Sequence, residues 1–287
     1  MAAVGTTVYG SEYNAVQTKI KGVLGTGVDY AYGNYGYNVA MSSGVVVATA
    51  LVTQLQWQNL ADDINKAITH QTNANFTGYA TISGLISYAN LSTLNTYADN
   101  AITNRLIAAA GQLTNDGAIH SPTRAAAWST NVKATGQVLW SSADDRRYFF
   151  NQGGYINFSG KAYATTPTIA QDLKWHQAMG YFSFNADYSV FSGLGATKPT
   201  GANYTLSNGT NANVFANPYN ADYIAVRCWL SSATVMDYEI WYVDDHVGIT
   251  GGPDNVSGGL GAYVNRVRAS GAFTGIQPTT QNVVNFA

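Results

Sequence analysis

The sequence predicts an α+β protein in which N-terminal amphipathic helices are followed by an antiparallel β-sandwich. In the first third of the chain, apolar residues recur at the three- and four-residue spacing of helices. Further along, β-branched and aromatic residues gather in short runs that Gly, Asn and Pro separate. We therefore divide the chain into a helical attachment or oligomerisation region (1–112), a linker (113–127) and a β-sandwich domain (128–287).

Three helices are predicted in the first region. The first is capped by Ser11 and stops at Gly25, the second starts at Thr53 with Gln56 completing a capping box, and the third is capped by Ser92. Each has a single apolar stripe, which suits a small bundle or packing against partner subunits. The stripes are Tyr13, Val16, Ile20, Val23 and Leu24; then Trp57, Leu60, Ile64, Ala67 and Ile68; then Leu94, Tyr97, Ala98, Ala101, Ile102 and Leu106.

The second half is expected to be mainly strands. In the segment Thr234–Val243, apolar side chains alternate with Asp237, Glu239 and Trp241, which indicates an antiparallel strand with one wet face. Residues 151–154 (Asn-Gln-Gly-Gly) are interpreted as a hairpin turn, and Ile169–Met179 as a short helix or loop. The predicted strands are Val138–Ser141, Tyr148–Phe150, Tyr155–Ser159, Tyr181–Val190, Tyr223–Leu230 and Thr234–Val243.

The chain is poor in charge and rich in aromatic residues. Asp, Glu, Lys and Arg make up 10% of its 287 residues, against about 25% in a typical protein. It nevertheless has 20 Tyr, 10 Phe and 6 Trp. Such a surface costs little to desolvate, and the cores of protein interfaces have the same character. We interpret the chain as one that is docked against other subunits, with a secreted β-rich protein as the alternative.

Charge and cysteine content exclude several classes. The net charge is −2 and the sequence has no basic run, so nucleic-acid binding has no electrostatic support. The single cysteine, Cys228, excludes an intramolecular disulfide and is expected to be a buried core thiol. Residues 1–9 do not follow the pattern of a signal peptide, and the longest apolar stretch, around 45–52, is too short to span a bilayer. We therefore expect neither a nucleic-acid nor a membrane partner.

The histidines form no recognisable metal or catalytic motif. None stands at ligand spacing from another His, Cys or carboxylate on one predicted element. His246 follows Asp244 and Asp245 at a strand end, and we interpret this group as a solvated turn rather than a metal or catalytic site. The four histidines are His70, His120, His176 and His246.

Two polar clusters offer possible ion sites. Oxygens from Asp244, Asp245, Asp254 and Asn255 in one Gly-rich loop can bind calcium, although their spacing is not that of an EF-hand. The charge cluster at 144–147 is interpreted as a solvated turn before a strand, with an intersubunit ion-pair site as the alternative.

Residues 25–27 (Gly-Thr-Gly) follow a helix, the wrong context for a phosphate loop. Nucleophile-elbow and Walker motifs are absent from the sequence, while paired glycosidase carboxylates can come from distant positions and stay open. We expect no catalytic, cofactor-binding or metal-binding residues, and interpret the tyrosines as core or interface residues, with a sugar-stacking platform as the alternative.

A set of short segments, in order along most of the chain, resembles a known protein family. The segments are Tyr13–Ile20, Val23–Gly27, Tyr35–Tyr37, Leu60–Ala67, His70–Thr72, Arg146–Phe158, Val243–Asp245 and Asp254–Gly258. Together they resemble virion structural proteins of tailed bacteriophages, notably contractile-tailed phages of cyanobacteria. Members of that family are virion constituents without an agreed enzymatic role.

The resemblance implies a location rather than a mechanism. We expect a non-enzymatic virion component, tail-associated as baseplate, fibre or fibre adaptor. It would be assembled in the host cytoplasm through low-charge Tyr/Asn-rich contacts with its own copies, as a homo-oligomer, and with other virion proteins. The alternatives are a carbohydrate- or receptor-binding tail module, with a host-surface glycan as partner, a capsid or neck decoration protein, and a hydrolase acting on cell-surface polymers.

Overall fold

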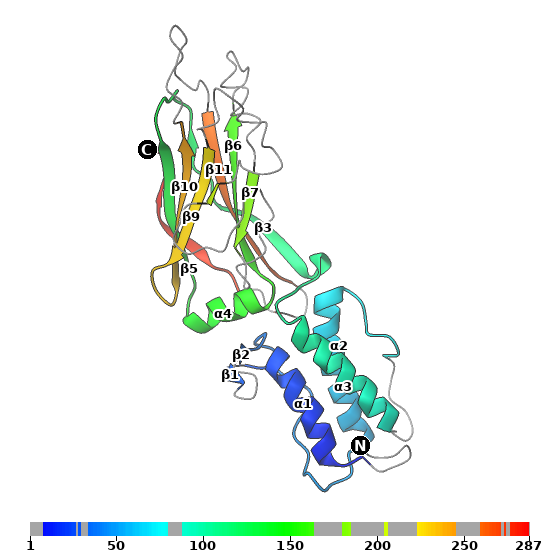
Figure 1. The fold of residues 1–287 in the computed structure, drawn as a ribbon. Coiled ribbons are helices and arrows are strands. Elements are labelled where there is room, and N and C mark those ends of the chain that lie inside the picture. Colours follow the sequence, from blue (N-terminus) through cyan, green and yellow to red (C-terminus); the bar gives the residue numbers. More distant parts are fainter. Residues whose placement is uncertain are drawn as a thin grey trace. The chain divides into compact units, whose positions relative to one another are not determined.

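The computed structural model gives an α+β fold, with helices first and antiparallel sheets after them, as predicted (Figure 1). Within the part of the chain that the structure describes, no helix is long and apolar enough to cross a membrane. The described residues are 8–26, 28–29, 34–79, 88–163, 180–184, 204–205, 223–244, 259–270, 273 and 276–286.

The chain forms two compact units that do not follow a simple division of the sequence. The helical unit contains residues 1–114 but also 147–154 and 268–276. The sheet unit contains residues 115–146, 155–267 and 277–287. Two segments from the C-terminal half of the chain therefore belong to the helical unit.

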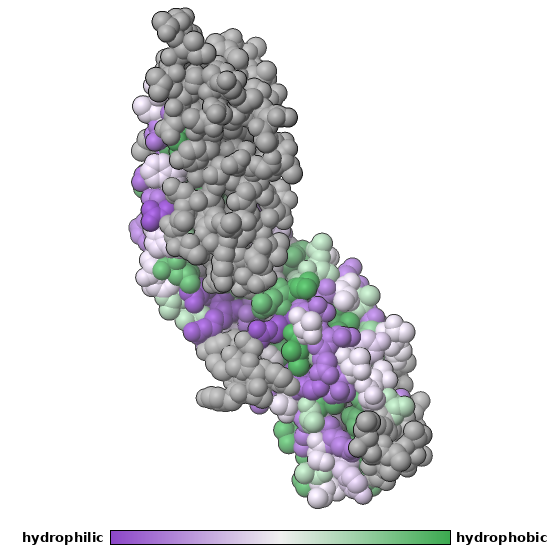
Figure 2. All heavy atoms as spheres, in the orientation of Figure 1, coloured by the Kyte–Doolittle hydropathy of each residue, from purple (hydrophilic) through white to green (hydrophobic). Residues whose placement is uncertain are grey.

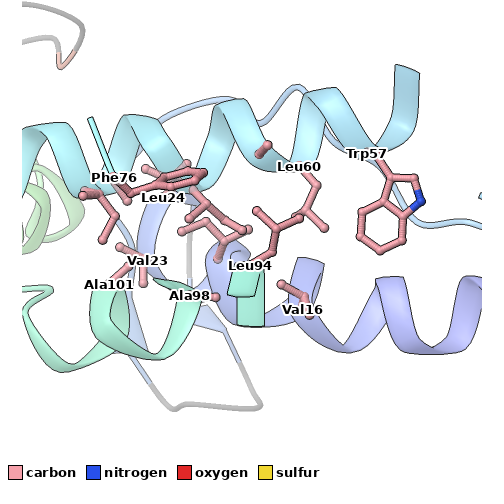
Figure 3. Packing of buried hydrophobic residues seen from close by; sticks show 14 of the residues in the cluster. Val16, Val23, Leu24, Trp57, Leu60, Phe76, Leu94, Ala98 and Ala101 are labelled. Carbon is pink, nitrogen blue, oxygen red and sulfur yellow. The ribbon is translucent and has the colours of Figure 1, made fainter. Parts of the chain in front are cut away.

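Three helices, α1 (Gly10–Leu24), α2 (Gln54–Thr72) and α3 (Tyr88–Thr103), build the helical unit. Side chains from all three meet in one buried apolar core, where Val16, Leu60 and Leu94 lie close together (Figure 3). The predicted stripes of α1 and α2 are buried throughout, while that of α3 is buried at Leu94, Ala98 and Ala101. A short two-stranded sheet, β1 (Val28–Asp29) with β2 (Asn34–Tyr35), also lies in this unit.

Helix ends agree with the sequence where the capping signal is reciprocal. At α2 the predicted capping box is confirmed, since Gln56 N donates to Thr53 Oγ1 (3.3 Å) and Thr53 N donates to Gln56 Oε1 (2.8 Å). The prediction that Ser11 caps α1 is wrong, because the helix starts at Gly10 and its N-cap is Tyr9, whose N–H donates to Glu12 Oε2 (3.1 Å). Ser92 lies inside α3, because that helix extends back to bury Leu91.

The strand predicted at Tyr148–Phe150 and the hairpin predicted at 151–154 are both wrong. Residues Ala143–Asn151 form helix α4, whose first turn is capped by Ser142 Oγ, the acceptor for Asp145 N at 3.0 Å. The helix ends where Gly153 takes a left-handed φ of 79° and Gly154 N donates to Phe149 O (2.9 Å). The cap and the glycine stop outweigh the strand preference of three consecutive aromatic residues.

Segments distant in the sequence complete the helical unit. Gln152 Nε2 donates to Tyr37 O at 2.6 Å, and Ser270 N donates to Gln112 O at 2.9 Å. The buried Phe273 ring lies against His70, with centroids 4.0 Å apart. The helical core therefore needs residues that lie beyond most of the sheet unit in the sequence.

The sheet unit has two sheets. One has the order β12-β5-β10-β9-β8, and the other has β3-β11-β6-β7 with β4 added against β11 (Figure 1). The pairings of β5 with β10 and β12, of β9 with β8 and β10, and of β6 with β7 and β11 are antiparallel. The strand bounds are β3 Leu113–His120, β4 Thr123–Arg124, β5 Val132–Leu139, β6 Tyr155–Tyr163, β7 Gly180–Phe184, β8 Tyr204–Thr205, β9 Tyr223–Leu230, β10 Val235–Val243, β11 Gly259–Ala269 and β12 Thr279–Val284.

The inner faces of the two sheets pack together as a sandwich. Tyr238 of β10 lies against Phe158 of β6 with ring centroids 5.4 Å apart, and Tyr242 Oη donates to Gly261 O of β11 at 2.7 Å. Met236, Tyr238, Ile240 and Tyr242 are all buried, so the alternation predicted for this strand is confirmed.

The other strand predictions differ in extent. Tyr223–Leu230 matches β9, whereas β5 precedes the predicted Val138–Ser141 and only overlaps it. The predicted strand Tyr181–Val190 overlaps β7 only at 181–184. Its residues 185–190, and all of Ile169–Met179, lie outside the described residues. Residues 113–127, predicted as a linker, instead carry β3 and β4. Strand β3 forms the edge of its sheet by pairing with β11 (Gly259–Ala269), about 150 residues later in the sequence, so nothing local in the sequence marks it as a strand.

Candidate functional site

An apolar patch lies on the surface of the helical unit, at the N-terminal end of α1. Its exposed fractions run from 48% at Tyr9 to 77% at Val45. Figure 2 shows apolar residues reaching the surface of this unit. The members, here called the apolar patch, are Tyr9, Val45, Val47, Leu51 and Leu55.

Backbone hydrogen bonds hold these residues in place. Tyr9 and Leu51 form an isolated antiparallel bridge. The N–H groups of the next two residues also donate to the loop that contains Val45–Leu51: Gly10 N donates to Ala50 O (2.9 Å) and Ser11 N donates to Ala48 O (3.0 Å). Gly10 packs so closely on the Val47 carbonyl that a Cβ would collide with it. The patch therefore stands on a fixed backbone.

Polar side chains from the helices anchor the same loop from beneath. Asn14 of α1 clamps Val46, donating to its carbonyl (2.6 Å) and accepting from its N–H (2.9 Å). Asp63 of α2 is fully buried and accepts from Ser42 N (3.0 Å) and Ser43 N (2.8 Å). The Val46 side chain points inward and is 7% exposed, while its neighbours Val45 and Val47 point outward. This arrangement exposes apolar side chains without leaving the loop loosely held.

The segment that carries Val45, Val47, Leu51 and Leu55 has no charged residue, whereas Glu12 lies beside Tyr9. Residues 30–61 contain no Asp, Glu, Lys or Arg. Depletion of charge together with exposed apolar side chains is the character of the core of a protein–protein interface.

A second candidate lies on the outer face of the β12-β5-β10-β9-β8 sheet. It is an open hollow of about 340 Å³. That volume is at the lower end of the range for small-molecule sites. The residues that line it, here called the sheet hollow, are Lys133, Thr135, Gly136, Gln137, Trp229, Asp237, Tyr238, Glu239 and Asn282.

Strand register brings the polar side chains of the sheet hollow into rows. Asp237 pairs with Gln137 on one side and with Trp229 on the other. Gln137 Nε2 donates to Asp237 Oδ1 at 2.7 Å, and Gln137 Oε1 accepts from Asn282 Nδ2 at 2.7 Å. Asn282 reaches this position at an irregularity in β12, where its φ is 49°. One connected network of amides and a carboxylate therefore spans three strands.

A second row centres on Glu239, where opposite charges meet. Its carboxylate contacts Lys133 Nζ at 3.3 Å and Arg227 at 3.7 Å, and accepts from Trp241 Nε1 at 3.1 Å. Lys133 Nζ also lies 4.6 Å from the Trp241 ring centroid, and the Arg227 guanidinium 4.8 Å from that of Trp229. The cations thus meet local carboxylates and indole rings rather than forming a basic patch.

Two of the predicted histidines are buried and serve packing. His70 Nε2 donates to Gln152 O at 2.9 Å, which fixes the tautomer, and burial lowers the pKa of His70 to about 4, although that hydrogen bond opposes the shift. His120 Nδ1 lies 2.5 Å from Tyr238 Oη, and burial lowers its pKa as well. Both are neutral core residues of their own unit.

The acidic loop and the remaining histidines cannot be placed as one group. Asp244 is buried, while Asp245, His246, Asp254, Asn255 and His176 lie outside the described residues. Among the residues that the structure does describe, no group of three or more His, Cys, Asp or Glu side chains is placed to hold a metal ion.

Cys228 and Gly25 lie as predicted, whereas the charge cluster at 144–147 does not. Cys228 is fully buried in the sandwich core, where burial raises the pKa of its thiol, as expected for a structural cysteine. The cluster at 144–147 does not form a turn before a strand, because it opens α4, with Asp144 and Asp145 at the favourable N-terminal end of the helix. Gly25 ends α1, as predicted.

Sequence reasoning missed both surfaces. The run Val45-Val46-Val47 inside a charge-free stretch was a signal for the apolar patch. The sheet hollow had no comparable signal, because it depends on which strands pair and in which register. No family model, curated protein or solved structure matches the chain.

Proposed function

We propose that the chain is a non-enzymatic structural component of a tailed-phage virion, tail-associated as baseplate, fibre or fibre adaptor. In this proposal the helical unit docks onto further copies of the same chain. The ordered resemblance and the low charge of the sequence support the virion assignment.

The apolar patch is the single observation that carries the docking role. Leu51, Leu55 and Val47 are 66–72% exposed yet stand on hydrogen-bonded backbone. A fixed apolar surface loses little conformational freedom when it binds, which favours association. A second copy is the favoured occupant because residues 30–61 offer no charge that would select an oppositely charged partner.

Sedimentation velocity of the full chain tests the docking role. The wild-type chain should form oligomers, and Val47→Asp should shift it towards monomer, because a buried unpaired carboxylate opposes association. Val284→Asp is the matched control, since Val284 is 51% exposed on β12 of the sheet unit. A monomeric wild-type chain, or equal behaviour of both variants, would contradict the docking role.

Mass spectrometry of purified phage particles tests the virion assignment separately. The chain should be present in particles at a copy number that is a multiple of the tail symmetry. Recovery from infected-cell lysate alone, with none in particles, would refute the assignment.

One observation favours a second candidate function, a carbohydrate-binding module of the tail. The sheet hollow combines an indole ring with amide and carboxylate groups in an open concave surface.

A further inference from the structure

We infer that the sheet hollow is a binding site for a neutral carbohydrate. The inference develops the second candidate function and does not depend on docking through the apolar patch, because all residues of the hollow belong to the sheet unit.

The hollow offers the two kinds of contact that a sugar ring requires. Trp229, which lines it, supplies an aromatic ring; the Arg227 guanidinium lies over one face at 4.8 Å from the centroid, and a pyranose would pack its C–H face on the other. Asp237, Gln137 and Asn282 supply a carboxylate and two amides, fixed by hydrogen bonds of 2.7 Å between them. Adjacent hydroxyl groups of a sugar both donate and accept, so they match a mixture of carboxylate and amide groups better than a site of one kind.

The fixed network adds to affinity. Gln137 is held on both sides, by Asp237 and by Gln281 Nε2 at 3.0 Å. Since these side chains are ordered before a ligand arrives, binding loses less conformational entropy than it would with free side chains. A sugar is only weakly hydrophobic, so its affinity depends on keeping this loss of conformational entropy small.

The balance of charge favours a neutral ligand. Lys133 and Arg227 both contact Glu239, and Asp237 adds a second carboxylate. A polyanion such as a nucleic acid needs an excess of cations, which this face lacks. An apolar small molecule needs a more enclosed and more apolar pocket than this open, polar hollow.

Binding of the full chain to a printed array of neutral hexose, hexosamine and deoxyhexose oligosaccharides tests the inference. The oligosaccharides retained on the array are then titrated in solution, with tryptophan fluorescence as the readout. We expect binding that changes less than about twofold between about 50 mM and about 500 mM NaCl, because no net charge is neutralised.

Substitutions in the hollow should remove this binding. Trp229→Ala and the isosteric Asp237→Asn should each weaken it by about tenfold or more, equivalent to about 1.4 kcal/mol. Asp99→Asn is the matched control for the carboxylate, because Asp99 is exposed on α3 of the helical unit, and it should bind as wild type. Asp237→Asn keeps the side-chain shape, so it remains informative if Trp229→Ala fails to fold, which thermal melting would show.

Three results would overturn the inference. They are no retention of any neutral oligosaccharide, retention only of charged glycans that is lost at high salt, and retention that Trp229→Ala and Asp237→Asn leave unchanged. Loss of a protein partner in these variants, without any sugar binding by the wild type, would assign the hollow to protein recognition instead. None of these results would alter the sedimentation behaviour expected from the apolar patch.

Discussion

The helical unit and the sheet unit place polar and apolar groups in opposite ways on their candidate surfaces. In the helical unit, the buried Asp63 and the partly buried Asn14 support a loop that turns apolar side chains outward. In the sheet unit, an apolar sandwich core supports a face that turns a polar network outward. This difference is the basis on which we propose different partners, a protein surface for the first and a hydroxyl-rich ligand for the second.

The largest predicted effect concerns the segment that completes the helical unit. Phe273→Ala removes a ring that is 3% exposed and packs on His70 and Tyr37, so the free energy of unfolding should fall by about 3–5 kcal/mol. Chemical denaturation followed by helix circular dichroism measures this loss. Val284→Ala, on the exposed end of β12, should change it by less than about 0.5 kcal/mol. Equal effects of the two variants would mean that the segment is not part of the core.

The next effect is a pH dependence that belongs to the helical unit. Burial lowers the pKa of His70 to about 4, below its unfolded value of about 6.5, so the unfolded chain binds the proton first. The part of the free energy of unfolding that depends on neutral His70 is therefore fully present above pH 6.5. It is lost as pH falls towards 4, by up to about 3 kcal/mol.

Replacing this histidine tests that assignment. In His70→Gln, the fall in stability between pH 6.5 and pH 4 should be smaller than in the wild type, whatever the absolute stability of the variant. Denaturant titrations at several pH values give the slope. An unchanged slope would mean that another group titrates on unfolding.

A smaller loss of stability is expected from a residue that holds the loop of the apolar patch but is not a member of the patch. Asn14→Ala removes both hydrogen bonds to Val46 and should cost about 1–3 kcal/mol. It should also weaken self-association, because the loop is no longer held. Asn95→Ala on α3, whose partly buried side chain accepts a hydrogen bond from Lys19 Nζ at 2.8 Å, is the control for self-association and should leave it unchanged.

The smallest effect is expected on the outer sheet face. Lys133→Met removes an ion pair whose lysine side chain is 41% exposed, so stability should change by less than about 1 kcal/mol. Thermal melting is sufficient to detect a larger change. A loss of several kcal/mol would mean that the polar face stabilises the sheet unit rather than serving a ligand.

Local signals predicted much of this fold. Thr53 and Gln56 mark a helix start through contacts three residues apart, and the alternation from Met236 to Tyr242 fixes which face of β10 is buried. Long-range pairing could not be predicted in this way. Strand β11 carries Arg266, whose charge is satisfied by Asp116 of β3 at 2.7 Å, a contact between residues far apart in the sequence. The sheet hollow depends on the same kind of information.

The aromatic residues of α4 show a different limit. Tyr148, Phe149 and Phe150 have strand preference, yet Ser142 before them and Gly153 after them set helix ends. Cap and stop residues flanking a short aromatic run were thus the better guide than the run itself.

The interleaved course of the chain also constrains its synthesis. A ribosome releases α1, α2 and α3 before strands β3 to β10, but Ala269 and Phe273 of the same core follow only after those strands. N-terminal regions generally fold first as a chain emerges, yet the core of this unit is complete only once Phe273 has been made. Products that stop before Ala269 would therefore lack a finished helical unit, even though every residue of its three helices is present.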